Sequence, residues 1–317
     1  MAKKLVFIAT LSFLMLLLVL SAGELLTRYI LGERLNTYKS ERDIAFQYDA
    51  ELGWRPRSNI HIGLTASREI QVRHNSRGFR DYEKLTKRPK ILFLGDSFVW
   101  GYDANSEERF TNLLQDSLPN WQMINLGVSG YGMDQAFLLL KEQLEFYKPK
   151  VVFWLISKND RQDNSTNQRY GGFYKPYSSL INDSLSFAGK PVPLGVSHYF
   201  NRYPMAARSY LFRAVLAAWL QYKHPVKTIP DPSHAILDAA KDYLSKQDIQ
   251  LLIGFNYLDP AMQEHCKKIG LSFINLQNKH YYPSYGSHWT PEGHQYARDG
   301  ILKLFEMGGF LQQRSKH

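Results

Sequence analysis

Five short apolar segments are spaced along the last two thirds of the chain, and helical patterns separate them. Each segment is apolar almost throughout, which is typical of strands covered on both faces of a parallel sheet. The strands are expected at 91–94, 123–126, 151–156, 251–255 and 271–276, and the helices at 109–118, 133–147, 234–245 and 260–269. This alternation predicts a three-layer α/β fold with right-handed crossovers.

One long stretch, at about 161–205, interrupts the alternation directly after the third strand. It contains two short alternating segments around Asn182 and Asp183, which indicate a hairpin. In open α/β sheets the ligand crevice lies beyond the carboxyl ends of the strands, so we expect this insertion to lie over the crevice. A helix at 206–222 is expected to follow it.

The residues before the sheet fall into two parts. Residues 51–81 alternate apolar and polar positions around glycine and asparagine, which predicts short strands and turns that pack on the following domain. Residues 24–45 indicate a helical stalk of mixed charge. We therefore divide the chain into a membrane anchor (1–23), a stalk with a small β-rich extension (24–88) and an α/β domain (89–317).

The amino terminus carries an uncharged apolar run at residues 5–20, preceded by Lys3 and Lys4. The run is long enough to span a bilayer with modest tilt, so it predicts a membrane-spanning helix. A cleavable signal peptide is the alternative, because small residues follow at 21–23. We favour an uncleaved anchor, since the apolar character continues past the run. The two lysines favour a cytoplasmic amino end, although basic residues after the span weaken that bias.

Charge and cysteine content narrow the classes of partner. The formal net charge is +10 and the pI is about 9.4, which favours anionic surfaces such as phospholipid or acidic polysaccharide. The chain has no cysteine-rich finger and no aromatic-basic RNA-binding signature, so we expect no nucleic-acid partner. The single cysteine, Cys266, rules out an internal disulfide but is compatible with an extracytoplasmic location.

Four polar blocks stand where predicted strands end. They are GDS at 95–97, NLGVSGYG at 125–132, SKND at 157–160 and, beyond the last strand, SHWTPEGH at 287–294. In order and position they resemble the four blocks of the SGNH (GDSL) hydrolases, a flavodoxin-like family of serine esterases and lipases. The resemblance extends from about residue 90 to the end of the chain. The stretches GWRPRSN, NSRGFRD and YGMDQ are similar to a membrane-anchored bacterial branch of that family.

The resemblance implies a flavodoxin-like parallel sheet and assigns the residues of a site. Ser97 is the nucleophile and His288 is its base, which a serine needs because an unassisted hydroxyl is a poor nucleophile. The backbone N–H groups of Ser97 and Gly130 and the side-chain amide of Asn159 form the oxyanion hole.

The sequence departs from the family at the acid. The family usually has an aspartate two or three residues before the catalytic histidine, and Gly286 and Tyr285 occupy those positions here. Three interpretations remain open. A backbone carbonyl of Tyr285 or Gly286 orients the imidazole, a distant carboxylate such as Asp160 or Asp299 replaces the acid, or the site has lost activity and only binds.

We therefore expect a membrane-anchored serine esterase that acts on acyl esters, in particular O-acetyl esters, through an acyl-enzyme on Ser97. Location and family analogy indicate a cell-envelope glycan as substrate, with the domain on the periplasmic side of a bacterial inner membrane. The alternatives are an O-acyltransferase on an envelope polysaccharide and a degenerate glycan-binding or scaffold protein. No cofactor or metal is expected, because no third ligand accompanies His288 and His294. The sequence predicts no particular protein partner.

Overall fold

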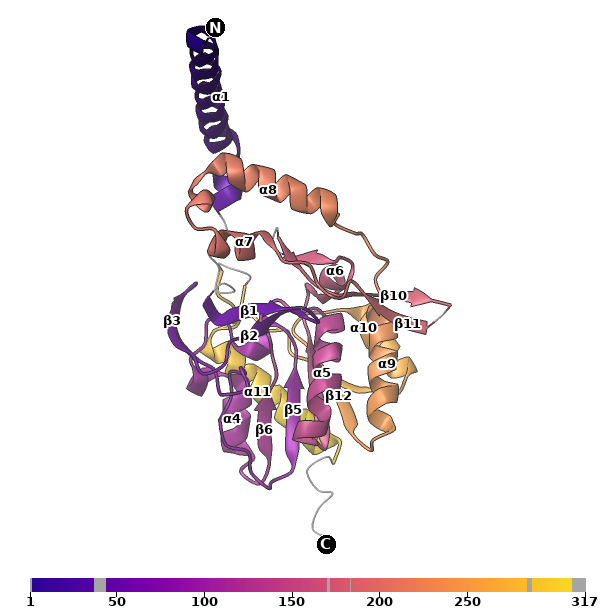
Figure 1. The fold of residues 1–317 in the computed structure, drawn as a ribbon. Coiled ribbons are helices and arrows are strands. Elements are labelled where there is room, and N and C mark those ends of the chain that lie inside the picture. Colours follow the sequence, from indigo (N-terminus) through magenta and orange to yellow (C-terminus); the bar gives the residue numbers. More distant parts are fainter. Residues whose placement is uncertain (1, 37–43, 170–171, 183, 284–286, 310–317) are drawn as a thin grey trace.

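The computed structural model describes residues 2–36, 44–169, 172–182, 184–283 and 287–309 (Figure 1). The α-helices are α1 (Ala2–Asn36), α3 (Ser97–Trp100), α4 (Phe110–Ser117), α5 (Met133–Tyr147), α6 (Asp160–Asn164), α7 (Val196–Arg202), α8 (Tyr210–Lys223), α9 (Ser233–Ser245), α10 (Pro260–Lys268) and α11 (Pro291–Met307). The strands are β1 (Phe46–Asp49), β2 (Gly53–Pro56), β3 (His61–Thr65), β4 (Glu69–Arg73), β5 (Lys90–Leu94), β6 (Gln122–Asn125), β7 (Val151–Ile156), β8 (Gln168–Arg169), β9 (Phe173–Tyr174), β10 (Tyr177–Ile181), β11 (Ser184–Ala188), β12 (Gln250–Phe255) and β13 (Ser272–Asn275).

A five-stranded sheet with the order β6-β5-β7-β12-β13 forms the centre of the α/β domain, and every neighbouring pair is parallel. Counted along the chain, its strands follow the order 2-1-3-4-5, which is the flavodoxin-like arrangement. The predicted three-layer α/β fold is confirmed. The order reverses between β5 and β7, and in such sheets the binding crevice lies at that point, beyond the strand ends.

The continuous apolarity of the strands arises because both faces of the sheet are covered. In β7, Val152, Trp154 and Ile156 join the core under α5 and α9, while the alternate residues join the core under α4 and α11. Successive side chains of a strand point to opposite faces, so all six positions of β7 are buried. Figure 1 shows these helix pairs on the two sides of the sheet.

The β-rich extension consists of two antiparallel hairpins, β1–β2 and β3–β4, which agrees with the short strands predicted there. Its apolar side chains are part of the same core as the sheet, among them Phe46, Trp54 and Val72. His74, after β4, accepts a hydrogen bond from the Trp100 indole N–H at 3.2 Å. The extension is therefore packed onto the segment that follows β5.

The insertion leaves the sheet at the carboxyl end of β7, as predicted. It includes the β10–β11 hairpin expected around Asn182, while Asp183 lies outside the described residues. Buried Lys175 pairs with buried Asp134 of α5, which attaches the insertion to the domain. Phe173 packs against Trp54 and Tyr174 is buried, so these aromatic residues cover apolar surface.

Helix α1 continues past residue 23 to Asn36, so the predicted anchor and the first part of the predicted stalk are one helix. Residues 37–43 lie outside the described residues. Helix α1 is long and apolar enough to cross a membrane, and its apolar side chains are exposed (Figure 1).

The His74 imidazole yields a test of how the extension is packed. Burial lowers the pKa of His74 to about 4. The hydrogen bond to the Arg57 carbonyl raises this pKa, while the charges of Arg80 and Arg109 lower it further. The unfolded chain therefore binds more protons at His74 between pH 6.5 and about 4, and stability should fall as the pH falls through this window, by at most about 1.4 kcal/mol per pH unit. Gln in place of His74 keeps an acceptor for Trp100 but does not titrate.

We expect the His74→Gln chain to lose less stability than the unsubstituted chain between pH 7 and pH 5. Urea unfolding of both full-length chains in detergent at the two pH values measures the difference. An equal loss in both chains would show that His74 is not held neutral in the folded protein.

Candidate active site

Ser97 stands at the carboxyl end of β5, in a turn that each residue of GDS helps to form. A Cβ atom on Gly95 would lie 2.6 Å from Val99 and 2.9 Å from the Leu155 carbonyl oxygen, so only glycine fits against β7 here. Asp96 caps α3 by accepting the Phe98 N–H at 3.0 Å, and its carboxylate also accepts the Ser157 hydroxyl at 2.9 Å. The turn leaves the Ser97 side chain partly exposed at the sheet edge.

His288 reaches Ser97 from the far end of the chain. Its Nε2 lies 2.8 Å from the Ser97 Oγ, although 191 residues separate them. The backbone on both sides of His288 is held, because its carbonyl accepts the Tyr282 N–H at 2.8 Å and the Thr290 N–H donates to the His280 carbonyl at 3.0 Å. The structure therefore brings the predicted nucleophile and the predicted base into hydrogen-bond contact.

Two aromatic rings from the nucleophile segment fix the plane of the imidazole. Tyr102 stacks on His288 with ring centroids 4.4 Å apart and an interplanar angle of 25°. Phe98 contacts the same ring at 5.2 Å. Because the ring is held in this way, its second nitrogen, Nδ1, has a defined direction.

The Nδ1 nitrogen faces a carboxylate that the sequence reasoning missed. Asp103 Oδ2 lies 3.7 Å from His288 Nδ1, and Nδ1 has no hydrogen-bond partner among the described residues. Asp103 is fully buried, and Ser67 fixes its carboxylate from the extension. The Ser67 N–H donates to Oδ1 at 2.9 Å and its hydroxyl donates to Oδ2 at 2.8 Å.

Asp103 is ionised at neutral pH despite its burial. Burial opposes the charged form, but the His288 imidazole and the two Ser67 donors outweigh it and hold the pKa of Asp103 below its usual value. A carboxylate next to an imidazole favours the charged imidazolium that forms when the histidine accepts a proton. Asp103 thus has the position and the charge of the acid in a Ser–His–Asp arrangement.

The carboxylates named from the sequence do not contact His288. Asp160 accepts the Ser157 N–H at 2.8 Å, and burial together with the Asp96 charge raises its pKa well above its usual value. Asp299 is exposed and pairs with Arg298 on α11. Tyr285 and Gly286, whose carbonyls were the other candidates, lie outside the described residues.

The three expected oxyanion donors follow three adjacent strands of the sheet. Ser97 comes after β5, Gly130 after β6 and Asn159 after β7. Among the described residues, the backbone N–H groups of Ser97 and Gly130 have no acceptor. The Asn159 amide donates one of its N–H groups to Asp163 at 2.7 Å, which fixes the side chain. Helix α3 is a single turn, so its dipole adds little here and the individual donors matter more.

Arg80, from the NSRGFRD stretch, holds the loop that contains Asp103 by hydrogen bonds. Its buried guanidinium donates to the backbone carbonyls of Gly101, Ala104 and Gln71, the last two at 2.6 and 2.9 Å. It therefore joins the extension to the loop on both sides of Asp103. The flanking stretch noted in the sequence has a structural task next to the site.

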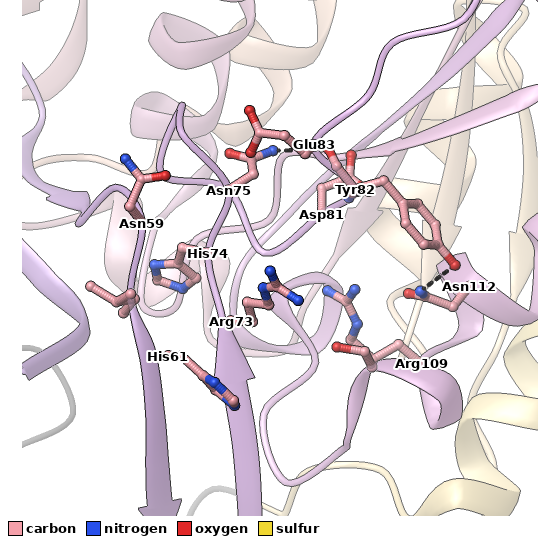
Figure 2. Close-up of a pocket in the computed structure, with 12 residues that line it drawn as sticks. Asn59, His61, Arg73, His74, Asn75, Asp81, Tyr82, Glu83, Arg109 and Asn112 are labelled. Atoms are coloured by element: carbon pink, nitrogen blue, oxygen red, sulfur yellow. Dashed lines mark hydrogen bonds between the residues drawn. The ribbon is translucent and has the colours of Figure 1, made fainter.

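A cavity of about 640 Å³ lies apart from these residues, between the β3–β4 hairpin, the segment before β5 and α4 (Figure 2). Figure 2 shows Arg73, His74 and Arg109 among its lining residues. Neither Ser97 nor His288 lines it, so it is not the crevice of the Ser97–His288 pair. His294 is also outside that pair: it is buried, stacks on Phe110, and burial lowers its pKa to about 3.

No protein-family profile and no curated protein matches this sequence. Solved structures do match. A putative lipolytic protein of the G-D-S-L family from Desulfitobacterium hafniense is 10% identical, with 68% of this chain and 99% of that chain covered and a TM-score of 0.41. A G-D-S-L family lipolytic protein from Veillonella parvula is 11% identical (68% and 98% covered, TM-score 0.41), and an acetyl xylan esterase is 13% identical (68% and 98% covered, TM-score 0.40).

The first two of these solved structures are named for the family that the four sequence blocks resemble. Their identities and TM-scores are low, so the assignment of an activity to this chain depends on the geometry of its own site.

Proposed function

We propose that this chain is a membrane-anchored serine ester hydrolase of the SGNH type, which forms an acyl-enzyme on Ser97. The hydrogen bond between the Ser97 hydroxyl and the His288 imidazole carries this proposal. A hydroxyl within reach of a base that is itself oriented by a third group is the arrangement that activates a serine. Asp103 and the two aromatic rings supply that orientation.

The reaction follows from these positions. The Ser97 Oγ attacks the ester carbonyl carbon while His288 Nε2 takes the hydroxyl proton, and Asp103 stabilises the imidazolium. The tetrahedral oxyanion is held by the N–H groups of Ser97 and Gly130 and by the Asn159 amide. Collapse breaks the bond to the leaving alkoxide, which takes the proton from His288. Water, deprotonated by His288, then attacks the acyl-enzyme, and the proton returns to Ser97 as the acid leaves.

The substrate we propose is an acyl ester, in particular an O-acetyl ester of a cell-envelope glycan. Helix α1 supports a location at the membrane, since it exposes an apolar surface that only lipid or another apolar partner would cover. Lys3 and Lys4 before the span favour a cytoplasmic amino end, which puts the α/β domain on the periplasmic side.

Replacement of the nucleophile tests the proposal directly. In the Ser97→Ala chain, turnover of a small acetyl ester such as 4-nitrophenyl acetate should fall by up to about 10⁶-fold, because no acyl-enzyme forms. Circular dichroism of the variant should match that of the unsubstituted chain. Ser245→Ala, at the exposed end of α9, is the control and should hydrolyse the ester normally. Normal turnover by Ser97→Ala would remove Ser97 from the mechanism.

The role of Asp103 has a separate test. Asp103→Asn keeps the size of the side chain but removes the charge that stabilises the imidazolium, so we expect kcat to fall by up to about 10⁴-fold with little change in KM. Asp299→Asn removes an exposed carboxylate on α11 and should not affect turnover. If both variants turn over the ester at the rate of the unsubstituted chain, Asp103 does not serve as the acid.

A further inference from the structure

Helix α8, in the insertion, is fastened to α1 where the apolar run ends. Glu24 of α1 accepts hydrogen bonds from the backbone N–H groups of Tyr210 and Leu211, each at 2.9 Å, and from the Ser209 hydroxyl at 2.7 Å. Ser209 is the N-cap of α8, and Tyr210 and Leu211 begin its first turn, where the backbone N–H groups have no intrahelical partners. The amino end of α8 is therefore held four residues beyond the apolar run at 5–20.

Two contacts between α8 and α1 show which side of α8 faces the apolar run of α1. Leu211 of α8 lies 3.4 Å from the position of a Cβ atom on Gly23, near the apolar end. Arg213 instead donates to the Leu35 carbonyl at 3.2 Å, twelve residues further along α1 and nearer the α/β domain. The side of α8 that carries Leu211 is thus the side that faces the proposed membrane.

The residues on the Leu211 side of α8 are apolar and exposed. Val215, Ala218 and Tyr222 follow Leu211 at helical spacing, and Trp219 borders the same stripe. Val215 is 60% exposed, Trp219 46% and Tyr222 88%. The opposite side of α8 packs against α7, where Leu220 is buried and Leu216 and Ala217 are partly buried. The helix therefore has one face on the protein and one apolar face that is largely exposed. At the borders of the exposed face, Trp219 contacts Tyr199 of α7 edge-on and Leu211 lies against α1.

The charge around α8 matches an anionic surface. Residues 184–230 contain six lysine and arginine residues and no aspartate or glutamate. A helix with basic flanks and a tryptophan- and tyrosine-containing apolar face is typical of helices that lie in the membrane interface, where aromatic rings with a polar edge are favoured.

We propose that the exposed face of α8 (Leu211, Val215, Ala218, Trp219, Tyr222) docks on the anionic phospholipid surface of the membrane that holds α1. This rests on the membrane anchoring proposed above. Figure 1 shows α8 lying across the carboxyl-terminal part of α1, on the side of the domain from which α1 extends. Two contacts with the same bilayer fix the orientation of the domain. Because the insertion leaves the sheet at the carboxyl end of β7, the docked helix places the Ser97 edge on the membrane side.

Spin labels on the full-length chain in phosphatidylcholine–phosphatidylglycerol liposomes test this surface. Labels at Val215→Cys and Tyr222→Cys should collide with oxygen, which concentrates in lipid, more than with a water-soluble nickel complex. Leu14→Cys, in the apolar run of α1, is the reference for lipid contact. Tyr296→Cys, an exposed aromatic position on α11, is the matched control for water contact. The native Cys266 is buried, so labelling at that position is expected to be low.

The outcomes separate this proposal from the anchor. Labels at 215 and 222 that behave like the label at 14 support docking. Labels at 215 and 222 that behave like the label at 296, while the label at 14 is in lipid, overturn docking and leave the anchor intact. Labels at 215 and 222 shielded from both reagents show that protein covers this face, which also overturns docking. A label at 14 that is exposed to water overturns the anchor, and docking with it.

Discussion

The proposed chemistry of the site depends on one contact, the hydrogen bond between the Ser97 hydroxyl and the His288 imidazole. A single 2.8 Å contact joins the end of the first strand of the sheet to the start of the last helix. It forms because the parallel sheet brings β5 and the segment before α11 to the same edge, where capping bonds and the bridge between Tyr281 and Trp289 hold the backbone. If the sheet did not bring them together at this edge, Ser97 and His288 would be ordinary residues of two separate turns.

In the proposed site, Asp103 takes the place of the aspartate that is missing before His288. The segment from Ser97 to Asp103 contains the proposed nucleophile, the two rings that flank the imidazole and the carboxylate that faces its second nitrogen. That carboxylate lies in the same segment as Ser97, whereas the family's usual aspartate precedes the histidine by two or three residues. Ser67 donates hydrogen bonds to this carboxylate and Arg80 holds the adjacent loop, and both residues lie in the segment before the sheet (24–88). The extension is thus part of the framework of the site.

Much of the α/β domain follows from the sequence, because strands covered on both faces are continuously apolar and the helices between them are amphipathic. The strand β7 and the helix α5 begin and end where the sequence predicts. Asp103 was not predicted, because its partners Ser67 and His288 lie 36 residues before it and far after it, and no spacing rule connects them. The contact between α8 and Glu24 is equally distant in sequence, since α8 was predicted only as a helix after the insertion.

Covalent labelling tests the central claim most directly. The full-length chain in detergent is treated with a fluorophosphonate, which reacts with activated serines, and the modified peptide is identified by mass spectrometry. The account predicts one adduct, on Ser97, which forms far more slowly in the His288→Ala chain because the hydroxyl then has no base to accept its proton. A folded chain that gains no adduct on Ser97 at neutral pH, or that gains it equally fast with His288 replaced by alanine, would contradict it.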